Sequence, residues 1–518
     1  MKVRSGSTII LHPWIAGIYP ILALLAFNID QIPISYAYRP IVVSIVGAGL
    51  MWLTFQFLVK DVNKSAILTT LTLVLFYTYG HFYASELIPA GLGEIFSKHR
   101  NLVFLFALIW GGTIFFVIRK SFQPAPISAT LNIVGTILLG FSIFQIGIYK
   151  ARVANQDNPA LDRAIVLNSD FLGGGSQLPD IYYIILDMYT RADFLTDQMN
   201  YDNDPFLQQL ENNGFYVADC SLSNYSITAF SLSSSLNLYY LDALVPNLDT
   251  DSKDHALMDP LIHNNLVRRS LEKIGYTIVA FQTDFPTTEL RDADYFISFE
   301  QINKFESLLI QTTAARILPE VYSLFKGQTN SDPDYLARQR QFELTNNVLN
   351  AAMTVPIQIE GPKFVFLHIV SPHPPFVFKA DGSFRQVIDI EDDPEIWKEY
   401  YVEQLTYINR RIFELITKIL TNSQVPPIVI VQGDHGIPVF ERKYFQHNEI
   451  LDAYYFPNGG DEVLYPTVSP VNSFRLMFNY YFGTELDLLD DRAFTSQWLD
   501  APYQFEAVGE QYPGCFEK

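Results

Sequence analysis

Asp434 and His435 are the residues of this sequence best suited by type and spacing to do chemistry. They stand between Gly433 and Gly436, directly after the apolar run Ile428–Val431. A short run rich in β-branched side chains is typical of a buried parallel strand. A carboxylate beside an imidazole at the end of such a strand is a compact oxygen and nitrogen donor pair for a metal ion. The alternative is a polar turn after a buried strand, and this pattern alone favours neither interpretation.

Two further strands are predicted to end in polar side chains. The apolar run Ile181–Leu186 is followed directly by Asp187. The run Phe364–Val370 carries His368 within it and His373 in the loop that follows. The carboxyl ends of parallel strands meet at one edge of a sheet, where open α/β sheets build their sites. We therefore expect these side chains to lie near the Asp-His pair.

A hydroxyl-rich segment, residues 220–237, offers a nucleophile. Its pattern predicts a helix packed on the sheet, with Thr228 at the amino end. A hydroxyl at a helix start is most often a cap. The alternative is a nucleophile that uses the helix amino terminus to hold an anion. Ser226 and Ser231 are close enough in sequence to take the same role.

The elements around these residues alternate between strand and helix. Beyond the strands above, the sequence predicts strands at 214–217 and 277–281, and helices at 205–212, 259–274, 302–326, 334–353 and 394–420. This alternation predicts an α/β domain with a doubly wound, mostly parallel sheet over residues 179–518. Residues 151–178, with Gly173-Gly174-Gly175-Ser176, have the composition of a flexible linker.

Residues 1–150 are expected to form a five-helix transmembrane domain. Each of five uncharged apolar segments is near the ~20 residues that a membrane-crossing helix needs. A signal peptide is a weaker interpretation of the first segment, because four more follow it. The segments are Ser5–Ile29, Ile41–Val59, Ser65–Ser85, Leu102–Ile118 and Ile127–Tyr149.

Charge divides the chain and suggests its location. The first 150 residues carry ten basic and four acidic side chains, and the rest carry 25 and 51. The excess of acidic residues after residue 150 argues against nucleic acid as a partner, because nucleic-acid binding needs a basic surface. Basic residues between the spans slightly favour an inside amino terminus in the cell membrane, which places the residues from about 151 onward outside the cytoplasm. There, Cys220 and Cys515 could form a disulfide or remain two thiols.

The order of these motifs resembles the alkaline phosphatase/sulfatase superfamily. A strand followed by Asp187, a hydroxyl at a helix start, a His-Pro-Pro loop and Gly-Asp-His-Gly appear in that order. The spans before an exported domain resemble its membrane-bound, sulfatase-like branch, which includes lipoteichoic acid synthases and phosphoethanolamine transferases. Further passages that carry the resemblance are 182–187, 223–232, 404–409 and 464–472.

The resemblance implies a role for each candidate residue. Asp187, Asp434 and His435 would bind one divalent ion, Zn or Mn, with Thr228 as the fourth ligand and the nucleophile. His373 would contact the substrate anion or protonate the leaving oxygen. Contacts to the substrate are expected from His368, Arg442 and His447. A second metal is not expected, because the Asp-x-x-x-His element of two-metal members is missing where it should stand.

The function predicted from these roles is that of a membrane-anchored, metal-dependent enzyme. It would be a phosphoryl-group transferase or phosphodiester hydrolase acting on a phospholipid or glycan of the cell envelope, with the lipid bilayer as its surroundings. Two alternatives remain. One is a sulfuric ester hydrolase without formylglycine, since no Cys/Ser-x-Pro-x-Arg motif is present. The other is a catalytically inactive, membrane-attached binding module.

Overall fold

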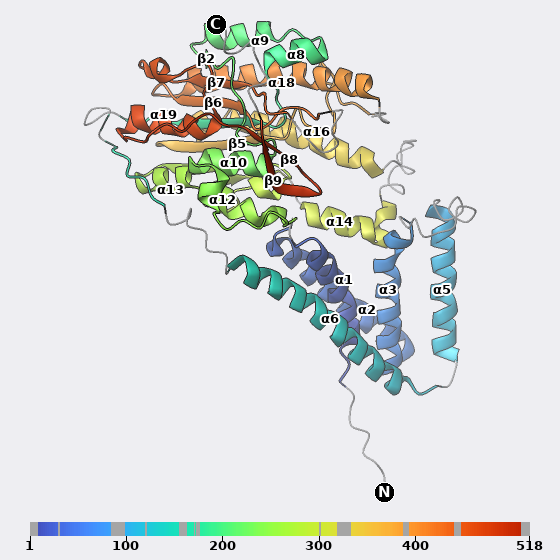
Figure 1. The fold of residues 1–518 in the computed structure, drawn as a ribbon. Coiled ribbons are helices and arrows are strands. Elements are labelled where there is room, and N and C mark those ends of the chain that lie inside the picture. The colour runs from blue at the N-terminus through green and yellow to red at the C-terminus, as the bar shows by residue number, and fades with distance from the viewer. Residues whose placement is uncertain are drawn as a thin grey trace. The chain divides into compact units, whose positions relative to one another are not determined.

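The structure, a computed structural model, forms two compact units (Figure 1). It describes residues 9–29, 32–83, 99–119, 122–154, 163–169, 171, 177–299, 302–318, 333–386, 393–439 and 447–508. The membrane unit comprises Met1–Gln156 together with Gln301–Pro333. The catalytic unit comprises Asp157–Glu300 and Asp334–Lys518.

The membrane unit contains a helix at each of the five predicted spans. The helices are α1 (His12–Phe27), α2 (Tyr38–Val59), α3 (Val62–Tyr83), α5 (His99–Arg119) and α6 (Pro124–Ala154). Of the described residues, three stretches are long and apolar enough to cross a membrane: Ile34–Val59, His99–Arg119 and Pro124–Arg152. Membrane-spanning helices are thus present, and the count of five spans stays a prediction.

A seven-stranded sheet with the order β2-β7-β6-β1-β5-β3-β4 is the centre of the catalytic unit. Its five strands from β6 to β4 are parallel, and β7 and β2 extend one edge in antiparallel pairing. The strands are β1 (Ile181–Leu186), β2 (Tyr216–Val217), β3 (Thr277–Phe281), β4 (Tyr295–Ile297), β5 (Lys363–Ile369), β6 (Ile428–Gly433) and β7 (Asp452–Tyr455). The predicted mostly parallel sheet is confirmed.

Helices pack on both faces of this sheet, as a doubly wound fold requires (Figure 1). One face is covered by α8 (Ala192–Met199), α9 (Asp204–Asn212), α16 (Pro333–Ala352), α17 (Val355–Gln358) and α18 (Pro394–Asn422). The other is covered by α10 (Thr228–Asn237), α12 (Asp259–His263), α13 (Leu266–Lys273) and α19 (Pro470–Phe482). The central strands β1 and β6 are buried along their whole length, which explains their continuous apolar runs.

Two predicted helices differ from those observed. The helix expected at 259–274 is two helices, because the Asn265 side chain accepts a hydrogen bond from Arg268 N at 2.8 Å and so caps a new start. Within the helix expected at 302–326, the described residues form α14 (Lys304–Thr312) and a 3-10 turn, η4 (Ala314–Ile317), and residues 319–326 lie outside the described part of the chain.

Elements that the sequence did not predict include β4, β7, α8, α19 and a carboxyl-terminal hairpin. The hairpin consists of β8 (Phe494–Gln497) and β9 (Ala501–Ala507). A further short helix, α11 (Leu241–Leu244), packs with this hairpin in one cluster of aromatic and aliphatic side chains. Of the two possibilities left open for the cysteines, Cys220 is disulfide-bonded, and Cys515 lies outside the described residues.

Asp452, the first residue of β7, has a buried carboxylate that is surrounded by polar side chains. It is fully buried and receives hydrogen bonds from Tyr454 Oη at 2.6 Å and Gln432 Nε2 at 3.0 Å. Burial raises the pKa of Asp452 to about 7, although these hydrogen bonds act in the opposite direction. The folded protein therefore holds a proton on Asp452 at pH values where the unfolded chain does not.

This proton makes stability depend on pH. Protonated Asp452 stabilises the folded protein. This contribution to the free energy of unfolding is complete below the unfolded-state pKa near 4. It is lost as the pH rises through 7 and amounts to at most about 4 kcal/mol. We expect Asp452→Asn, which mimics the protonated carboxyl, to remove most of this loss. Thermal unfolding of the full chain in detergent with a chelator, from pH 5 to 8, measures it. The exposed control Asp500→Asn should behave as the parent, and equal pH slopes in all three proteins would contradict the assignment.

Candidate metal centre

The register of the sheet brings the two candidate aspartates together. Strands β1 and β6 are parallel neighbours, with Leu186 paired to Gly433. Asp187 and Asp434 are the next residues of the two strands, so both emerge at the same carboxyl edge. This edge is where open α/β sheets place their sites.

Asp187, Asp434 and His435 form one compact group. Their potential ligand atoms all lie within 4.8 Å of one another, and all three residues are buried. His435 Nε2 is 3.4 Å from Asp187 Oδ1 and 3.7 Å from Asp434 Oδ2. Among the residues that the structure describes, this is the one group of three or more such side chains with that geometry.

The atoms that face the centre are the ones without hydrogen bonds. Asp434 Oδ1 accepts hydrogen bonds from the backbone N–H groups of Met188 (3.0 Å) and His435 (2.9 Å). Asp434 Oδ2 and Asp187 Oδ1 are buried and accept none from any described residue. His435 Nδ1 lies 2.8 Å from the carbonyl of Gly436, which holds its N–H there and leaves Nε2 for a ligand. Two oxygens and one nitrogen left open in this way fit a divalent metal ion.

The charges of the centre shift its titration strongly. Burial acts to lower the pKa of His435, but the carboxylates of Asp434 and Asp187 outweigh it and raise the pKa to about 9. Burial acts to raise the pKa of Asp187, but His373, His435 and His368 together hold it well below its ordinary value. Without a metal, a proton on His435 thus compensates part of the negative charge.

The two glycines of the Gly-Asp-His-Gly motif serve close packing of the chain. A Cβ on Gly433 would lie 2.3 Å from the Tyr189 carbonyl, and one on Gly436 would lie 3.0 Å from the Glu449 carbonyl. Neither glycine has a positive φ angle. Neighbouring loops occupy the space that a side chain would need at either position. The strained residue of the centre is instead Met188, with a φ of 64°.

Thr228 is the first residue of α10, at the same edge of the sheet. The chain before it pairs with the segment beside the Asp-His loop, since Ser223 N donates to Asn448 O at 2.7 Å. Seven residues later, Ser235 Oγ lies 3.2 Å from the hydroxyl of Tyr183, in the first half of β1. Helix α10 therefore begins near the carboxyl edge of the sheet and runs back along β1.

The Thr228 hydroxyl is available for chemistry. The cap residue of α10 is Ile227, so the capping role considered for Thr228 does not apply. Among the described residues, the Thr228 hydroxyl makes no hydrogen bond, whereas Ser226 Oγ is paired with Thr495 Oγ1 at 3.1 Å. Ser231 lies in the first turn and donates its backbone N–H to Ile227 O. Ser226 Oγ is thus engaged, and Thr228, which begins α10, is more exposed than Ser231, at 8% against 1%.

His373 and His368 stand next to Asp187. The backbone N–H of His373 donates to the carbonyl of Asp187 at 3.1 Å, and the side chain is only partly buried. His368 Nε2 is 3.7 Å from Asp187 Oδ2, and its Nδ1 is held by the Thr288 hydroxyl at 2.9 Å. His368 has no exposed side-chain surface. It is therefore placed to orient Asp187, and His373 is placed to meet a substrate.

His447 lies beside the loop that follows His435. Its carbonyl accepts the backbone N–H of Gly436 at 2.8 Å, and its ring packs 4.5 Å from Phe194. The side chain is 24% exposed, so it can reach a substrate. Arg442, the other predicted substrate contact, lies outside the described residues.

Residues that the sequence did not single out as part of the site hold these loops in place. Gln404 of α18 donates to the carbonyls of Pro372 and His373, both at 3.1 Å. Tyr401 donates to the carbonyl of Met188 at 2.9 Å. Both residues lie on the buried face of an amphipathic helix. A polar residue on such a face is the sequence signal that could have indicated them.

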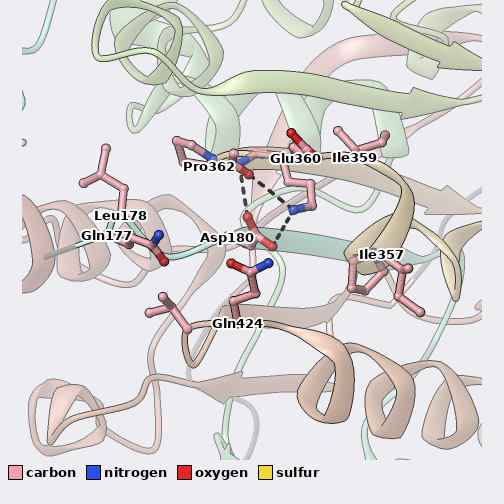
Figure 2. A pocket seen from close by; sticks show the side chains of 12 residues that line it. Gln177, Leu178, Asp180, Ile357, Ile359, Glu360, Pro362 and Gln424 are labelled. Carbon is pink, nitrogen blue, oxygen red and sulfur yellow. Dashed lines mark hydrogen bonds and ion pairs between the residues drawn. The ribbon is translucent and has the colours of Figure 1, made fainter.

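A cavity of about 590 Å³ lies at the opposite edge of the sheet (Figure 2). It is lined by Asp180, which precedes β1, and by Lys363, which begins β5. These two side chains form an ion pair at 2.6 Å, so their charges compensate each other. The cavity is thus remote from the carboxyl edge and is no part of the metal centre.

No protein-family model and no curated protein matches the sequence. Several solved structures are similar. The periplasmic domain of EptC from Escherichia coli, in complex with Zn, is 12% identical, with a TM-score of 0.41 over 63% of this chain and 88% of that one. The integral membrane lipooligosaccharide phosphoethanolamine transferase A from Neisseria meningitidis is 11% identical, with a TM-score of 0.38 over 96% and 98%.

A third structure is an alkaline phosphatase superfamily protein from Vibrio parahaemolyticus. It is 10% identical, with a TM-score of 0.39 over 68% of this chain and 82% of that one. All three belong to the groups that the sequence motifs resemble. Since the TM-scores lie below 0.5, we base the proposed function on the geometry of the metal centre and not on these neighbours.

The raised pKa of His435 predicts that metal and protons compete. At pH 7 a metal ion must displace the proton from His435, so we expect binding to release about one proton per ion. The affinity should rise about tenfold per pH unit between pH 6.5 and 8.5. Calorimetric titration of Zn²⁺ into the chelator-treated full chain, in buffers of different ionisation enthalpy, measures both. His447→Ala should leave both values unchanged, and pH-independent binding would contradict the assignment.

Proposed function

We propose that this protein is a membrane-anchored, metal-dependent phosphoryl-group transferase or phosphodiester hydrolase that uses Thr228 as its nucleophile. The observation that carries the proposal is the convergence of Asp187 Oδ1, Asp434 Oδ2 and His435 Nε2, all buried and open toward one point. The position of Thr228 at the start of α10, on the same edge, adds the nucleophile.

The three side chains would hold one Zn or Mn ion, since mixed carboxylate and imidazole donors suit both. When bound, the ion supplies positive charge that lowers the pKa of a coordinated hydroxyl and neutralises charge on phosphoryl oxygens. His368 Nε2 lies 3.7 Å from Asp187 Oδ2, and the Gly436 carbonyl fixes the orientation of His435. These contacts prepare the centre before a substrate arrives.

The amino terminus of α10 supports the same chemistry. The backbone N–H groups of Thr228 and Ala229 make no hydrogen bond to another described residue. Free N–H groups at a helix start, together with the helix dipole, stabilise an anion. The phosphoryl group that Thr228 attacks would therefore receive hydrogen bonds from the same turn that carries the nucleophile.

The reaction has two balanced steps. Thr228 Oγ1 gives its proton to solvent and bonds to phosphorus, while the bond from phosphorus to the leaving alcohol breaks and that alcohol takes a proton from His373. A hydroxyl of an acceptor, or water, then attacks the phosphothreonine and gives its proton to the now neutral His373. The bond from phosphorus to Thr228 Oγ1 breaks, Oγ1 takes a proton from solvent, and transfer or hydrolysis is complete. A phospholipid or an envelope glycan outside the cytoplasm suits an enzyme joined to membrane helices.

Thr228 variants test the proposal. We expect Thr228→Ala to lower turnover of phospholipid in vesicles by more than 1,000-fold while metal content stays the same, because the ligand set loses only one of four members. Thr228→Ser should retain turnover within about tenfold, since it keeps the hydroxyl. Mass measurement of the proteolytic peptide that contains Thr228, after incubation with vesicles of phosphatidylethanolamine and phosphatidylglycerol, should show a phosphoryl adduct in the parent and none in Thr228→Ala.

Parallel assays decide between this function and its alternatives. An aryl sulfate hydrolysed faster than a phosphodiester would favour a sulfuric ester hydrolase. Absence of a divalent ion from the purified full chain, even after supplementation, would favour a binding module. Full activity of Thr228→Ala, with Ser226→Ala as the matched neighbour, would overturn the nucleophile assignment alone.

A further inference from the structure

The segment α14–η4 (Lys304–Ile317) lies in sequence between strands β4 and β5 of the catalytic sheet but is part of the membrane unit. The chain consequently passes between the two units three times, at residues 156–157, 300–301 and 333–334. A single linker at residues 151–178 was expected from the sequence. The contacts of α14–η4 inside the membrane unit show how firmly this segment is built in.

Phe305 is the apolar contact of this segment. It is completely buried in the core of the membrane unit. The core there consists of side chains from α1, the following turn, α2 and α3: Ile21, Leu25, Ile32, Tyr36, Ala37, Ala48, Leu73 and Tyr77. Leu308 and Leu309 pack on the same cluster. Full burial of a phenylalanine contributes about 1.5–3 kcal/mol.

Glu306 is the polar contact. Its carboxylate accepts the backbone N–H of Asn303 at 2.9 Å, which completes a capping box at the start of α14. The same carboxylate is paired with both Nε and Nη2 of Arg39, at the start of α2. The side chains of Glu306 and Arg39 are 10% and 55% exposed, so solvent screens the pair in part, and its two-pronged geometry adds directional specificity.

Gly80 provides the closest contact. A Cβ at this position of α3 would lie 2.2 Å from the carbonyl oxygen of Gln311 and 2.4 Å from the carbonyl carbon of Thr312. Those are backbone atoms of α14, which cannot turn aside as a flexible side chain can. One turn further, the guanidinium of Arg316 lies over the ring of Tyr83 at 4.5 Å. Only glycine allows α14 and α3 to approach this closely.

We propose that α14–η4 is a docking segment that attaches the catalytic unit to the membrane unit and gives the enzyme its preference for substrates carried in the bilayer. A tethered site meets bilayer substrates at a higher effective concentration than a site on a loose linker. The preference rests on the function proposed above, whereas the docking does not. Loss of docking therefore lowers turnover of a lipid and leaves turnover of a small soluble ester unchanged.

A charge exchange tests the pair in the full chain. Arg39→Glu and Glu306→Arg each place like charges together, so each should increase amide hydrogen exchange of residues 304–312 at least tenfold. Each should lower turnover of phosphatidylethanolamine in vesicles about tenfold, with turnover of bis(p-nitrophenyl) phosphate within twofold of the parent. The double variant restores opposite charges but not the capping box, so it should return turnover to within about threefold of the parent and the exchange only in part.

A matched glycine pair gives a second test. Gly80→Ala should show the same increase in amide hydrogen exchange of residues 304–312 and the same loss of lipid turnover, with turnover of the soluble ester unchanged. Gly111→Ala, on α5 where a Cβ would meet nothing within 4 Å, should show neither. The docking is overturned if exchange of residues 304–312 is the same in Gly80→Ala, Gly111→Ala and both charge variants. If exchange rises but lipid and soluble turnover fall equally, the docking stands and the specificity role fails. If the parent turns over neither ester, the proposed function fails, and the exchange data still decide the docking.

Discussion

Two buried carboxylates at one edge of the sheet are the constraint on which the rest of this structure depends. The side chains of Asp187 and Asp434 are 6% and 0% exposed. Two ionised carboxylates out of water and close together cost several kcal/mol each unless positive charge compensates them. A protonated His435 supplies one charge, and a divalent ion with neutral His435 supplies two. The second arrangement balances the charge of the two carboxylates completely, which is the physical reason why a metal suits the centre.

Such a centre requires rigid surroundings. Gly433 and Gly436 let neighbouring loops close over the Asp-His pair. Met188, which follows Asp187, has a left-handed backbone conformation, and its backbone N–H donates to the Asp434 carboxylate. Side chains of α18 hold the loops after β1 and β5. The free energy that fixes these loops comes from the apolar layers on both faces of the sheet. Packing far from the chemistry thus places the ligands before any substrate binds.

The sequence predicts the parts of this account that follow from local pattern. Apolar runs that end in Asp187 and Asp434 predicted buried strands and their shared edge, because parallel strands align their carboxyl ends. Thr228 at a helix start followed from the change to small and apolar residues. The break at Asn265 was missed, because one side chain's hydrogen bond overrides a continuous helical pattern. The hairpin of β8 and β9 and the place of α14 depend on contacts between residues far apart in the chain. A local sequence pattern cannot predict such contacts.

The place of α14 differs from what its position in the sequence indicates. It lies in the chain between β4 and β5, yet Phe305 and Glu306 make it an integral part of the membrane unit. Attachment to the bilayer and assembly of the metal centre are therefore separate properties. The first depends on packing in the membrane unit, and the second on charge at the sheet edge.

The most direct measurement of the central claim is anomalous diffraction from crystals of the full-length protein grown with Zn²⁺. The account predicts one strong peak at the carboxyl edge, about 2.0–2.2 Å from Asp187 Oδ1, Asp434 Oδ2 and His435 Nε2. Thr228 Oγ1 should complete the coordination. A peak elsewhere, no peak at this edge, or a Thr228 hydroxyl directed away from the ion would contradict it.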